Sequence, residues 1–205
     1  WDTFHDGSST QDQKVDWCYD NATAVFLAAG NFGNSARHYS GTVNANDSSD
    51  FIQINVNDVI ANSTYLNFNL VWFDGLSFRN NLFLKYYDSN FNEITDSYGF
   101  PTTESIRGTE SKISQTLSTL PESSGTYYLR VINQSPNIQP FHIYEHYKNG
   151  KVTFANSDPD FTIVSPSTAD YAFCVGAYVS RDSWTAYNSG IYNFNQQLDE
   201  LAIFS

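Results

Sequence analysis

The chain has 205 residues, of which 22 are acidic and 10 are basic, and its formal net charge at pH 7 is −12. This charge argues against nucleic acid or an anionic membrane surface as a partner, because both are negatively charged. Hydrophobic residues make up 40% of the chain, enough to bury a full core in one or two domains. The longest apolar run, Ala24 to Ala29, is far below the roughly 20 residues of a membrane-spanning helix, so no membrane span is predicted.

Composition also bears on the compartment. The chain contains no methionine, even at position 1, so we expect a segment of a longer product. Two cysteines are too few for a disulfide scaffold, and Cys18 and Cys174 are predicted either as small buried hydrophobes or as the ends of one long-range disulfide. A surface rich in Asn and Ser, with four N-x-[ST] triplets, favours an extracellular or secreted glycoprotein. The candidate glycosylation sites are Asn21, Asn46, Asn62 and Asn133.

The first predicted element is a helix. Ser9 to Asp12 has the spacing of a capping box, and Val15, Cys18 and Tyr19 recur at the positions that form one helical face. The helix is expected to end near Asn21.

Two short apolar runs lie near the ends of the chain. Neither Ala24 to Ala29 nor Phe173 to Ala177 alternates with polar residues, which is typical of strands buried on both faces of a parallel sheet. A glycine-punctuated loop, Gly30 to Asn34, follows the first run. Together with the helix, the two runs indicate an α/β unit.

Between these runs the hydrophobic pattern has a period of two. Short alternating stretches separated by turn residues predict half-buried antiparallel strands, as in a β-sandwich or jelly roll. The predicted strands are 52–56, 66–72, 82–87, 114–117, 126–132 and 141–147. The fold class is therefore mixed, with partial α/β flanks and an inserted all-β domain. The predicted domains are residues 1–37, 38–155 and 156–205.

Several stretches of the flanks match the motifs of a known family. Ala28 to Gly33 reads A-A-G-N-F-G, Ile163 to Ala177 contains S-P-S-T-A and V-G-A, and the chain ends on Ile203 to Ser205. These resemble the A-A-G-N-x-G, S-P-x-T-A…V-G-A and F-S-S-x-G-P motifs of the subtilisin-like serine proteases. Trp1 to Asp12 is similar to the segment that precedes A-A-G-N in bacterial alkaline members. In that family the A-A-G-N and S-P-x-T-A stretches lie a few residues apart, whereas here they bracket the predicted sandwich.

The predicted sandwich has a resemblance of its own. Gly41 to Phe51, Leu82 to Asn90 and Gly125 to Val131 are similar to the G-T-V…F, L-x-L-Y-D-x-x-G and G-T-Y-Y-x-R-V pattern of the pre-peptidase C-terminal type of β-sandwich. Asn90-Phe91 stands where that pattern has glycine, and the turn is still expected because Asn tolerates left-handed geometry. Such modules usually follow a protease domain, so a position inside one is unusual.

The protease resemblance implies roles for individual residues. Asn31 would be the side-chain donor of an oxyanion hole, where a fixed amide N–H stabilises the negative charge that acyl transfer builds on the scissile carbonyl oxygen. The alternative is that Gly30 and Asn31 only turn a strand into a loop. The residues implied as substrate-binding walls of the primary specificity pocket are Ala28, Ala29 and Gly30 on one side and Val164, Ser165 and Pro166 on the other.

The catalytic triad itself is missing. The D-[ST]-G, H-G-x and G-T-S motifs of the family do not occur, so the isolated chain is expected to be inactive and the triad to lie elsewhere in the parent protein.

The chain is predicted to be a segment of a secreted serine endopeptidase that hydrolyses peptide bonds. Its expected partners are a peptide or protein substrate and the remaining parts of the protease domain, and exposed strand edges would favour self-association. The alternative is an extracellular β-sandwich interaction or adhesion module in a non-catalytic pseudo-protease.

No cofactor is expected to be required, although calcium would suit acidic turns such as those of Asp47, Asp50 and Asp88. His142 and His146 do not form an H-E-x-x-H motif, and residues four apart on a strand are separated by about 13 Å, too far to share one zinc ion.

Four tyrosines offer rings for stacking on sugars or peptides, but most are expected in the core or in cross-strand pairs. They are Tyr86, Tyr87, Tyr127 and Tyr128.

Overall fold

The computed structural model describes residues 4–57, 66–75, 79–116, 124–146, 151–187 and 190–204. Within these ranges strands carry most of the regular structure, and α1 (Thr10–Asp20) is the one helix. With 11 residues, α1 is not long and apolar enough to cross a membrane. The strands are β1 (Phe26–Ala28), β2 (His38–Val43), β3 (Ile52–Asn57), β4 (Asn67–Phe73), β5 (Leu82–Tyr87), β6 (Glu93–Ile94), β7 (Ser97–Gly99), β8 (Thr103–Glu104), β9 (Thr109–Thr116), β10 (Gly125–Asn133), β11 (Gln139–Glu145), β12 (Lys151–Phe154), β13 (Phe173–Val175), β14 (Ser183–Thr185) and β15 (Ile191–Asn193).

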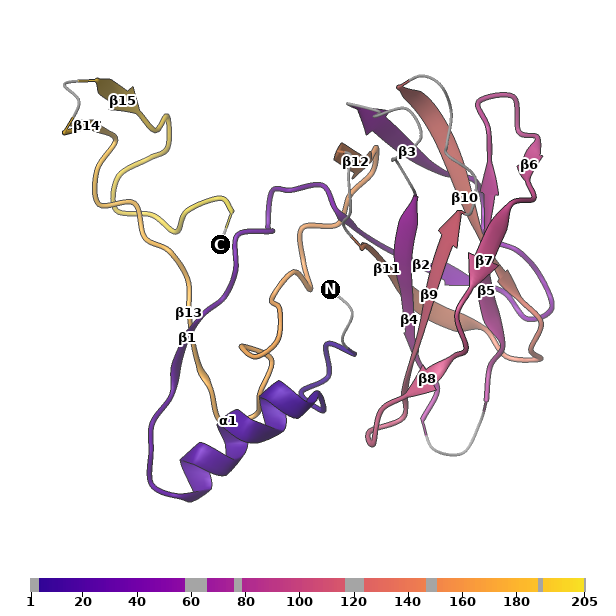
Figure 1. Cartoon of the computed structure of the whole chain (residues 1–205), viewed down its shortest axis with the longest axis horizontal. Coiled ribbons are helices and arrows are strands. Elements are labelled where there is room, and N and C mark those ends of the chain that lie inside the picture. The colour runs from indigo at the N-terminus through magenta and orange to yellow at the C-terminus, as the bar shows by residue number, and fades with distance from the viewer. Residues whose placement is uncertain are drawn as a thin grey trace.

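The strands from β2 to β12 form a sandwich of two sheets, on the right of Figure 1. One sheet has the strand order β12-β3-β10-β5-β6, and the other has the order β2-β11-β4-β9-β7, with β8 also paired to β9. All of these pairings are antiparallel. The antiparallel strands predicted from the alternation of apolar and polar residues are therefore confirmed.

That alternation also explains the core. In β5, every second side chain points inward: Leu82, Leu84 and Tyr86 are at most 5% exposed. They belong to one buried cluster with Trp72 and Leu129 from neighbouring strands. The remaining residues of β5 face away from the core and are half-buried.

The four tyrosines follow the same rule, as predicted. Tyr86 and Tyr127 are buried in the core. Tyr87 and Tyr128 lie directly opposite each other on adjacent strands and face outward. The outer face of this sheet thus carries aromatic rings.

Strand boundaries differ from the prediction in several places. β9 begins at Thr109 instead of Ser114, and residues 117 and 147 lie outside the described ranges. β6, β7, β8 and β12, which have two to four residues each, are absent from the sequence-based prediction. Such a short stretch contains too few alternations to be recognised by periodicity. β2, which contains a glycine and several polar residues, was not predicted as a separate strand either.

The chain enters and leaves the sandwich at one place. The backbone N–H of Phe154 donates to the Ala36 carbonyl at 2.8 Å, and the N–H of Asp158 donates to the His38 carbonyl at 2.9 Å. The segment before β2 and the segment after β12 are therefore joined to each other, and both flanks leave the sandwich together (Figure 1).

The flanks contain α1, the parallel pair β1 and β13, and the hairpin of β14 and β15. The predicted mixed fold class, with α/β flanks, is wrong, because the structure is nearly all β and its parallel ladder pairs only these two strands within the described ranges. Phe26, Phe173 and Val175 are 69%, 51% and 50% exposed. An apolar run can be buried on both faces only where further strands and helices cover it, and the described residues of the flanks do not supply them.

The helix begins and ends where predicted. The Ser9 hydroxyl accepts from the backbone N–H of Asp12, and Asn21 is the C-terminal cap. The predicted apolar face is wrong at Tyr19, which is 47% exposed, whereas Val15 is buried and Cys18 is half-buried.

The flanks pack on the outer face of the sheet that contains β11 through a stack of rings. His5 stacks on Tyr144 with ring centroids 4.1 Å apart, and the Tyr144 hydroxyl donates to the Phe161 carbonyl at 3.2 Å. His38 stacks on the same Tyr144 at 4.5 Å, and its Nε2 lies 3.0 Å from Nδ1 of His142. We call His5, His38, His142, Tyr144 and Phe161 the histidine stack.

Polar contacts beside the histidine stack hold the flanks in the same position. The guanidinium of Arg107 donates to both carboxylate oxygens of Asp170, at 2.9 and 2.6 Å. The Ser105 hydroxyl donates to Asp6 at 2.6 Å. The turn between β8 and β9 of the sandwich therefore holds one residue from each flank.

Burial keeps the imidazoles of the histidine stack uncharged at neutral pH. It lowers the pKa of His5 from 6.5 to about 4. Burial also lowers the pKa of His38 and His142, although Asp158 near both rings acts in the opposite direction.

We expect a core truncation to destabilise the sandwich strongly. Leu129 is 0% exposed, so Leu129→Ala should lower the free energy of unfolding by about 2–5 kcal/mol. Leu198 is 44% exposed, so Leu198→Ala is a matched control with an expected change within about 0.5 kcal/mol. Urea unfolding followed by intrinsic fluorescence measures both variants. Equal losses would contradict the placement of Leu129 in the core.

We also expect acid to loosen the packing of the flanks. The pKa of His5 is about 4 in the folded chain and has its ordinary value of 6.5 in the unfolded chain. Between these two values the unfolded chain binds more protons than the folded chain, so the free energy of unfolding falls as the pH decreases from 6.5 toward 4. His5→Phe keeps a stacking ring and removes one protonation site, so the fall should be shallower in this variant. Thermal unfolding at a series of pH values measures it, and equally steep curves for both proteins would count against the prediction.

Candidate functional site

The pairing of β1 with β13 brings distant parts of the chain together. Ala28 lies opposite Val175, and the Ala29 N–H donates to the Val175 carbonyl at 2.9 Å. The loop after β1 therefore starts beside the residues that follow β13, at the left of Figure 1. The two segments enclose a hollow of about 370 Å³, lined by Phe26 to Asn31 and by Val175 to Ala177.

Gly30 suits the backbone of the loop after β1. Its φ angle is +108°, a conformation that residues with a side chain rarely adopt. A Cβ atom at this position would lie 3.4 Å from Cγ2 of Val164, so Val164 packs directly against the loop. The structure thus brings Gly30 and Val164 into contact, one from each of the two predicted pocket walls. Asn31 follows Gly30 with an exposed side chain.

The segment around Ser165 is held by the start of α1. Oδ1 of Asp12 accepts hydrogen bonds from the hydroxyls of Ser165 and Thr168, each at 3.0 Å. The hydroxyls of Ser9 and Ser165 also lie 2.8 Å apart. Asp12 is 1% exposed, and its negative charge lies in the first turn of the helix, where the helix dipole favours an anion. Asp12 therefore fastens one predicted wall to the helix.

A further hydrogen bond joins this wall to β1. The Ser167 hydroxyl donates to the Ala28 carbonyl at 2.7 Å. The end of the chain closes the same loop, because the Gly33 N–H donates to the Phe204 carbonyl at 3.1 Å. The A-A-G-N stretch thus contacts both the stretch that contains S-P-S-T-A and the residues around Phe204.

The residues around the hollow differ in part from those predicted. Ala28, Ala29, Gly30 and Asn31 line it, but the segment Val164 to Pro166 does not, and its other side is formed by Val175 to Ala177. Asp12 was predicted only as part of a helix cap. Its place in the first helical turn was the only signal that the sequence offered, because its hydrogen-bond partners lie more than 150 residues away.

The candidate glycosylation sites fall into different environments. Asn21 and Asn46 are exposed. Asn133 is 1% exposed, and its amide nitrogen donates to the carbonyls of Asn44 and Asn137, so its side chain is not accessible to glycosylation in the folded chain. Asn62 lies outside the described residues.

The two cysteines are free in the structure, Cys18 half-buried and Cys174 exposed, so they do not form the long-range disulfide. Because Cys174 is exposed, it is not the small buried hydrophobe of the alternative prediction.

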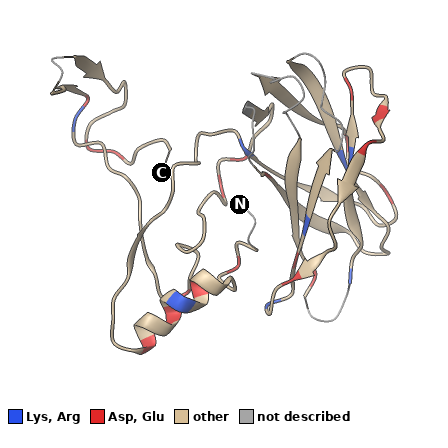
Figure 2. Ribbon diagram, viewed as in Figure 1, with Lys and Arg blue, Asp and Glu red and all other residues tan. Residues whose placement is uncertain are grey.

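The described residues also bear on whether the chain offers a metal site. Within the described ranges no group of three or more His, Cys, Asp or Glu side chains is arranged to hold a metal ion, and the calcium site stays a prediction. Glu145 accepts from Arg37 Nε at 2.6 Å, and His142 belongs to the histidine stack. Acidic residues outnumber basic ones, 22 to 10, and in Figure 2 both kinds are spread over the sandwich and the flanks.

Comparisons with known proteins bear on the fold of the chain. No protein-family model matches the chain, and no curated protein matches it either. Among solved structures, the chain is similar to the CspB protease of Clostridium perfringens, with a TM-score of 0.63 and 17% sequence identity. The match covers 99% of this chain and 42% of that protease, so the chain spans less than half of its length. The flanks and the sandwich together therefore share their fold with part of a protease.

We expect the thiols to react as free cysteines. The exposed Cys174 should react rapidly with Ellman's reagent in the folded chain without prior reduction, and the half-buried Cys18 should react more slowly. Cys174→Ser should remove the fast phase. The absence of any reaction until a reductant is added would instead show that the two cysteines are bonded.

Proposed function

We propose that the chain is a segment of a subtilisin-like serine endopeptidase, to which it contributes an oxyanion-hole donor and part of the substrate cleft. The observation that carries this proposal is the parallel pairing of β1 with β13. It joins the A-A-G-N loop to the stretch that contains S-P-S-T-A and V-G-A, although the sandwich separates them in the sequence. The fold shared with a protease over 99% of the chain supports the same proposal.

Asn31 has the chemistry that this role requires. When a nucleophile attacks a peptide carbonyl, negative charge develops on the oxygen, and a prepositioned amide N–H stabilises it without reorganisation. The side chain of Asn31 is exposed, and the backbone two residues before it is held by the bond between Ala29 and Val175. The amide is thus presented at the edge of the hollow.

The hollow beside Asn31 suits one side chain of a bound peptide. Small residues form much of its lining, including Ala28, Ala29, Gly176 and Ala177, and leave a volume of about 370 Å³. In this proposal the Ser-His-Asp triad comes from parts of the protein outside the given sequence, and the protein acts outside the cell. A serine nucleophile would approach the carbonyl carbon while Asn31 binds the oxygen.

We expect Asn31→Ala, made in the intact parent protein, to lower kcat by about 10²–10³-fold with little change in KM. The interaction forms mainly in the transition state, so its loss affects turnover more than substrate binding. Asn34→Ala is the matched control, because Asn34 is exposed in the same loop. Steady-state hydrolysis of a peptide substrate measures both variants, and unchanged turnover in Asn31→Ala would refute its role.

A fluorophosphonate probe for reactive serines tests the wider proposal on protein from the native source. Labelling of a polypeptide that contains or copurifies with this chain is expected. An intact parent protein without a reactive serine would leave the sandwich as the functional part and would exclude the endopeptidase.

A further inference from the structure

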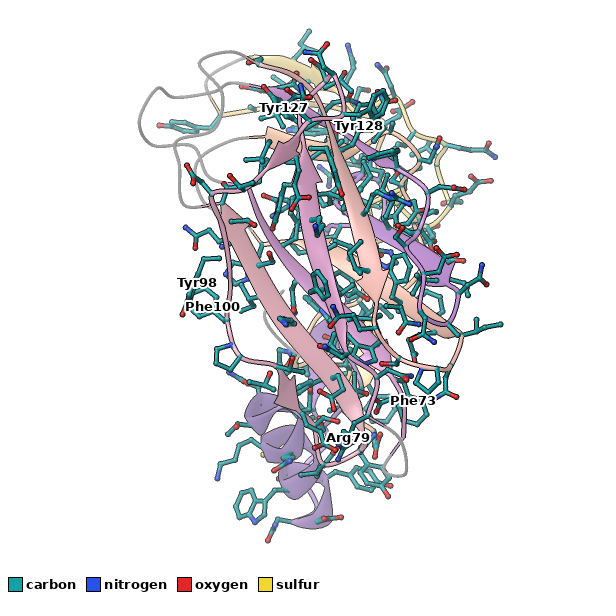
Figure 3. The ribbon with its side chains drawn as sticks, turned by 90° about the vertical axis from the view of Figure 1, so that its right-hand side faces the viewer. Phe73, Arg79, Tyr98, Phe100, Tyr127 and Tyr128 are labelled. Atoms are coloured by element: carbon teal, nitrogen blue, oxygen red, sulfur yellow. The ribbon has the colours of Figure 1, made fainter. Side chains whose placement is uncertain are left out.

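The outer face of the sheet β12-β3-β10-β5-β6 carries a group of aromatic rings that the proposed cleft does not use. Phe91 stacks on Tyr128 with ring centroids 4.5 Å apart, and Phe51 lies 4.8 Å from Phe91 and 5.1 Å from Tyr87. We call Phe51, Tyr87, Phe91 and Tyr128 the ring cluster. Phe91 is 50% exposed and Phe51 is 40% exposed, so the cluster presents apolar surface to solvent. In Figure 3, Tyr128 lies at the opposite end of the sandwich from Phe73 and Arg79.

Phe91 has a backbone conformation that is unfavourable for a bulky residue. Its φ angle is +63°, in the left-handed region that glycine adopts without strain. The turn is held by Asp88, whose carboxylate accepts from the backbone N–H groups of Asn90 and Asn92 at 2.8 and 2.9 Å. The Phe91 N–H donates to the Asp88 carbonyl at 3.1 Å. The turn therefore holds a half-exposed ring in a conformation unfavourable for it, as is found at residues that bind ligands.

A hollow of about 720 Å³ continues from the ring cluster along the same face. Its lining includes Tyr87, which belongs to the cluster, together with Phe83 and Ile132. Polar side chains complete the lining, among them Asp47, Lys85 and Gln134. Apolar and hydrogen-bonding groups therefore lie side by side over a continuous surface.

The local charge does not favour a polyanion. Lys85 is paired with Glu93 at 2.8 Å. The Arg130 guanidinium lies over the ring of Phe51 at 4.8 Å. Acidic residues, Asp47 and Asp88, accompany these cations, and the whole chain carries a charge of −12. A neutral ligand is the better electrostatic match.

The position on the sheet also limits how a peptide could bind. Extended peptides are commonly recognised through a free strand edge. Here β3, β10 and β5 each pair with a neighbour on both sides, so their backbone groups are engaged. Only side chains on this face are therefore available to a ligand. The aromatic rings can stack on its C–H groups, and the polar side chains can form hydrogen bonds with its hydroxyl groups.

We propose that the ring cluster and the adjoining hollow bind an unbranched, neutral, β-1,4-linked oligosaccharide. Such a chain is a flat ribbon whose sugar rings present alternating C–H faces, and it can lie along a sheet face. One pyranose would stack on Phe91 and Phe51, while the next sugars reach the hollow and bond to Asp47, Lys85 and Gln134. This site is separate from the proposed protease cleft and does not rest on it.

The test is titration of the full chain with hexamers of β-1,4-linked glucose and of β-1,4-linked N-acetylglucosamine, measured by calorimetry. The chain is produced without N-glycosylation, because Asn46 also lines the hollow. Binding of at least one hexamer at millimolar concentration or below is expected. Phe91→Gly should weaken that binding by about tenfold or more while the Tm stays the same or rises, because glycine relieves the φ of +63°.

Two further variants separate binding from folding. Asp47→Ala alters the hollow without touching the ring cluster and should also weaken binding. Tyr98→Ala is the control, because Tyr98 is 47% exposed and pairs with Phe100 on the other sheet, away from Tyr128 in Figure 3. Absence of binding to both hexamers, or equal affinity in Phe91→Gly and wild type, would overturn the proposal. Binding of gelatin in place of both sugars, lost in Phe91→Gly, would assign the face to a polypeptide instead and would equally overturn it.

Discussion

The arrangement of the whole chain depends on the two hydrogen bonds that join the start and the end of the sandwich. The Phe154 N–H bonds to Ala36, and the Asp158 N–H bonds to His38. Because an inserted domain with adjacent ends adds little separation between the segments on either side, the flanks can still meet after more than a hundred intervening residues. These two bonds keep the flanks close enough for β1 to pair with β13.

The sandwich and the flanks are stabilised by different means. The sandwich has an apolar core in which Trp72, Tyr86 and Leu129 are at most 1% exposed. The flanks leave large apolar side chains exposed, among them Phe26 and Phe173, and they are held mainly by polar and aromatic contacts. Asp12, the ion pair of Arg107 with Asp170 and the histidine stack are the principal ones. The packing of the flanks is sensitive to acid, because burial lowers the pKa of His5 in the histidine stack.

Two surfaces with different chemistry result from this arrangement. The hollow beside Asn31 is formed by small residues and one exposed amide, which suits the backbone and side chains of a peptide. The face with the ring cluster lies on the sandwich, where every central strand is paired and only side chains are available. Under the two proposals, the hollow beside Asn31 holds a peptide and the face with the ring cluster holds a saccharide.

Local patterns in the sequence determined much of the secondary structure. Alternation predicted most of the longer strands, Ser9 predicted the start of the helix, and Gly30 marked the loop that follows β1. These signals are readable because they depend on neighbouring residues only. Tertiary structure decided the rest: the exposure of β1 and β13, the burial of Asn133, the partners of Asp12, and the separation of Cys18 from Cys174 as free thiols. Each of these depends on which distant segments pack together, and periodicity along the chain carries no information about that choice.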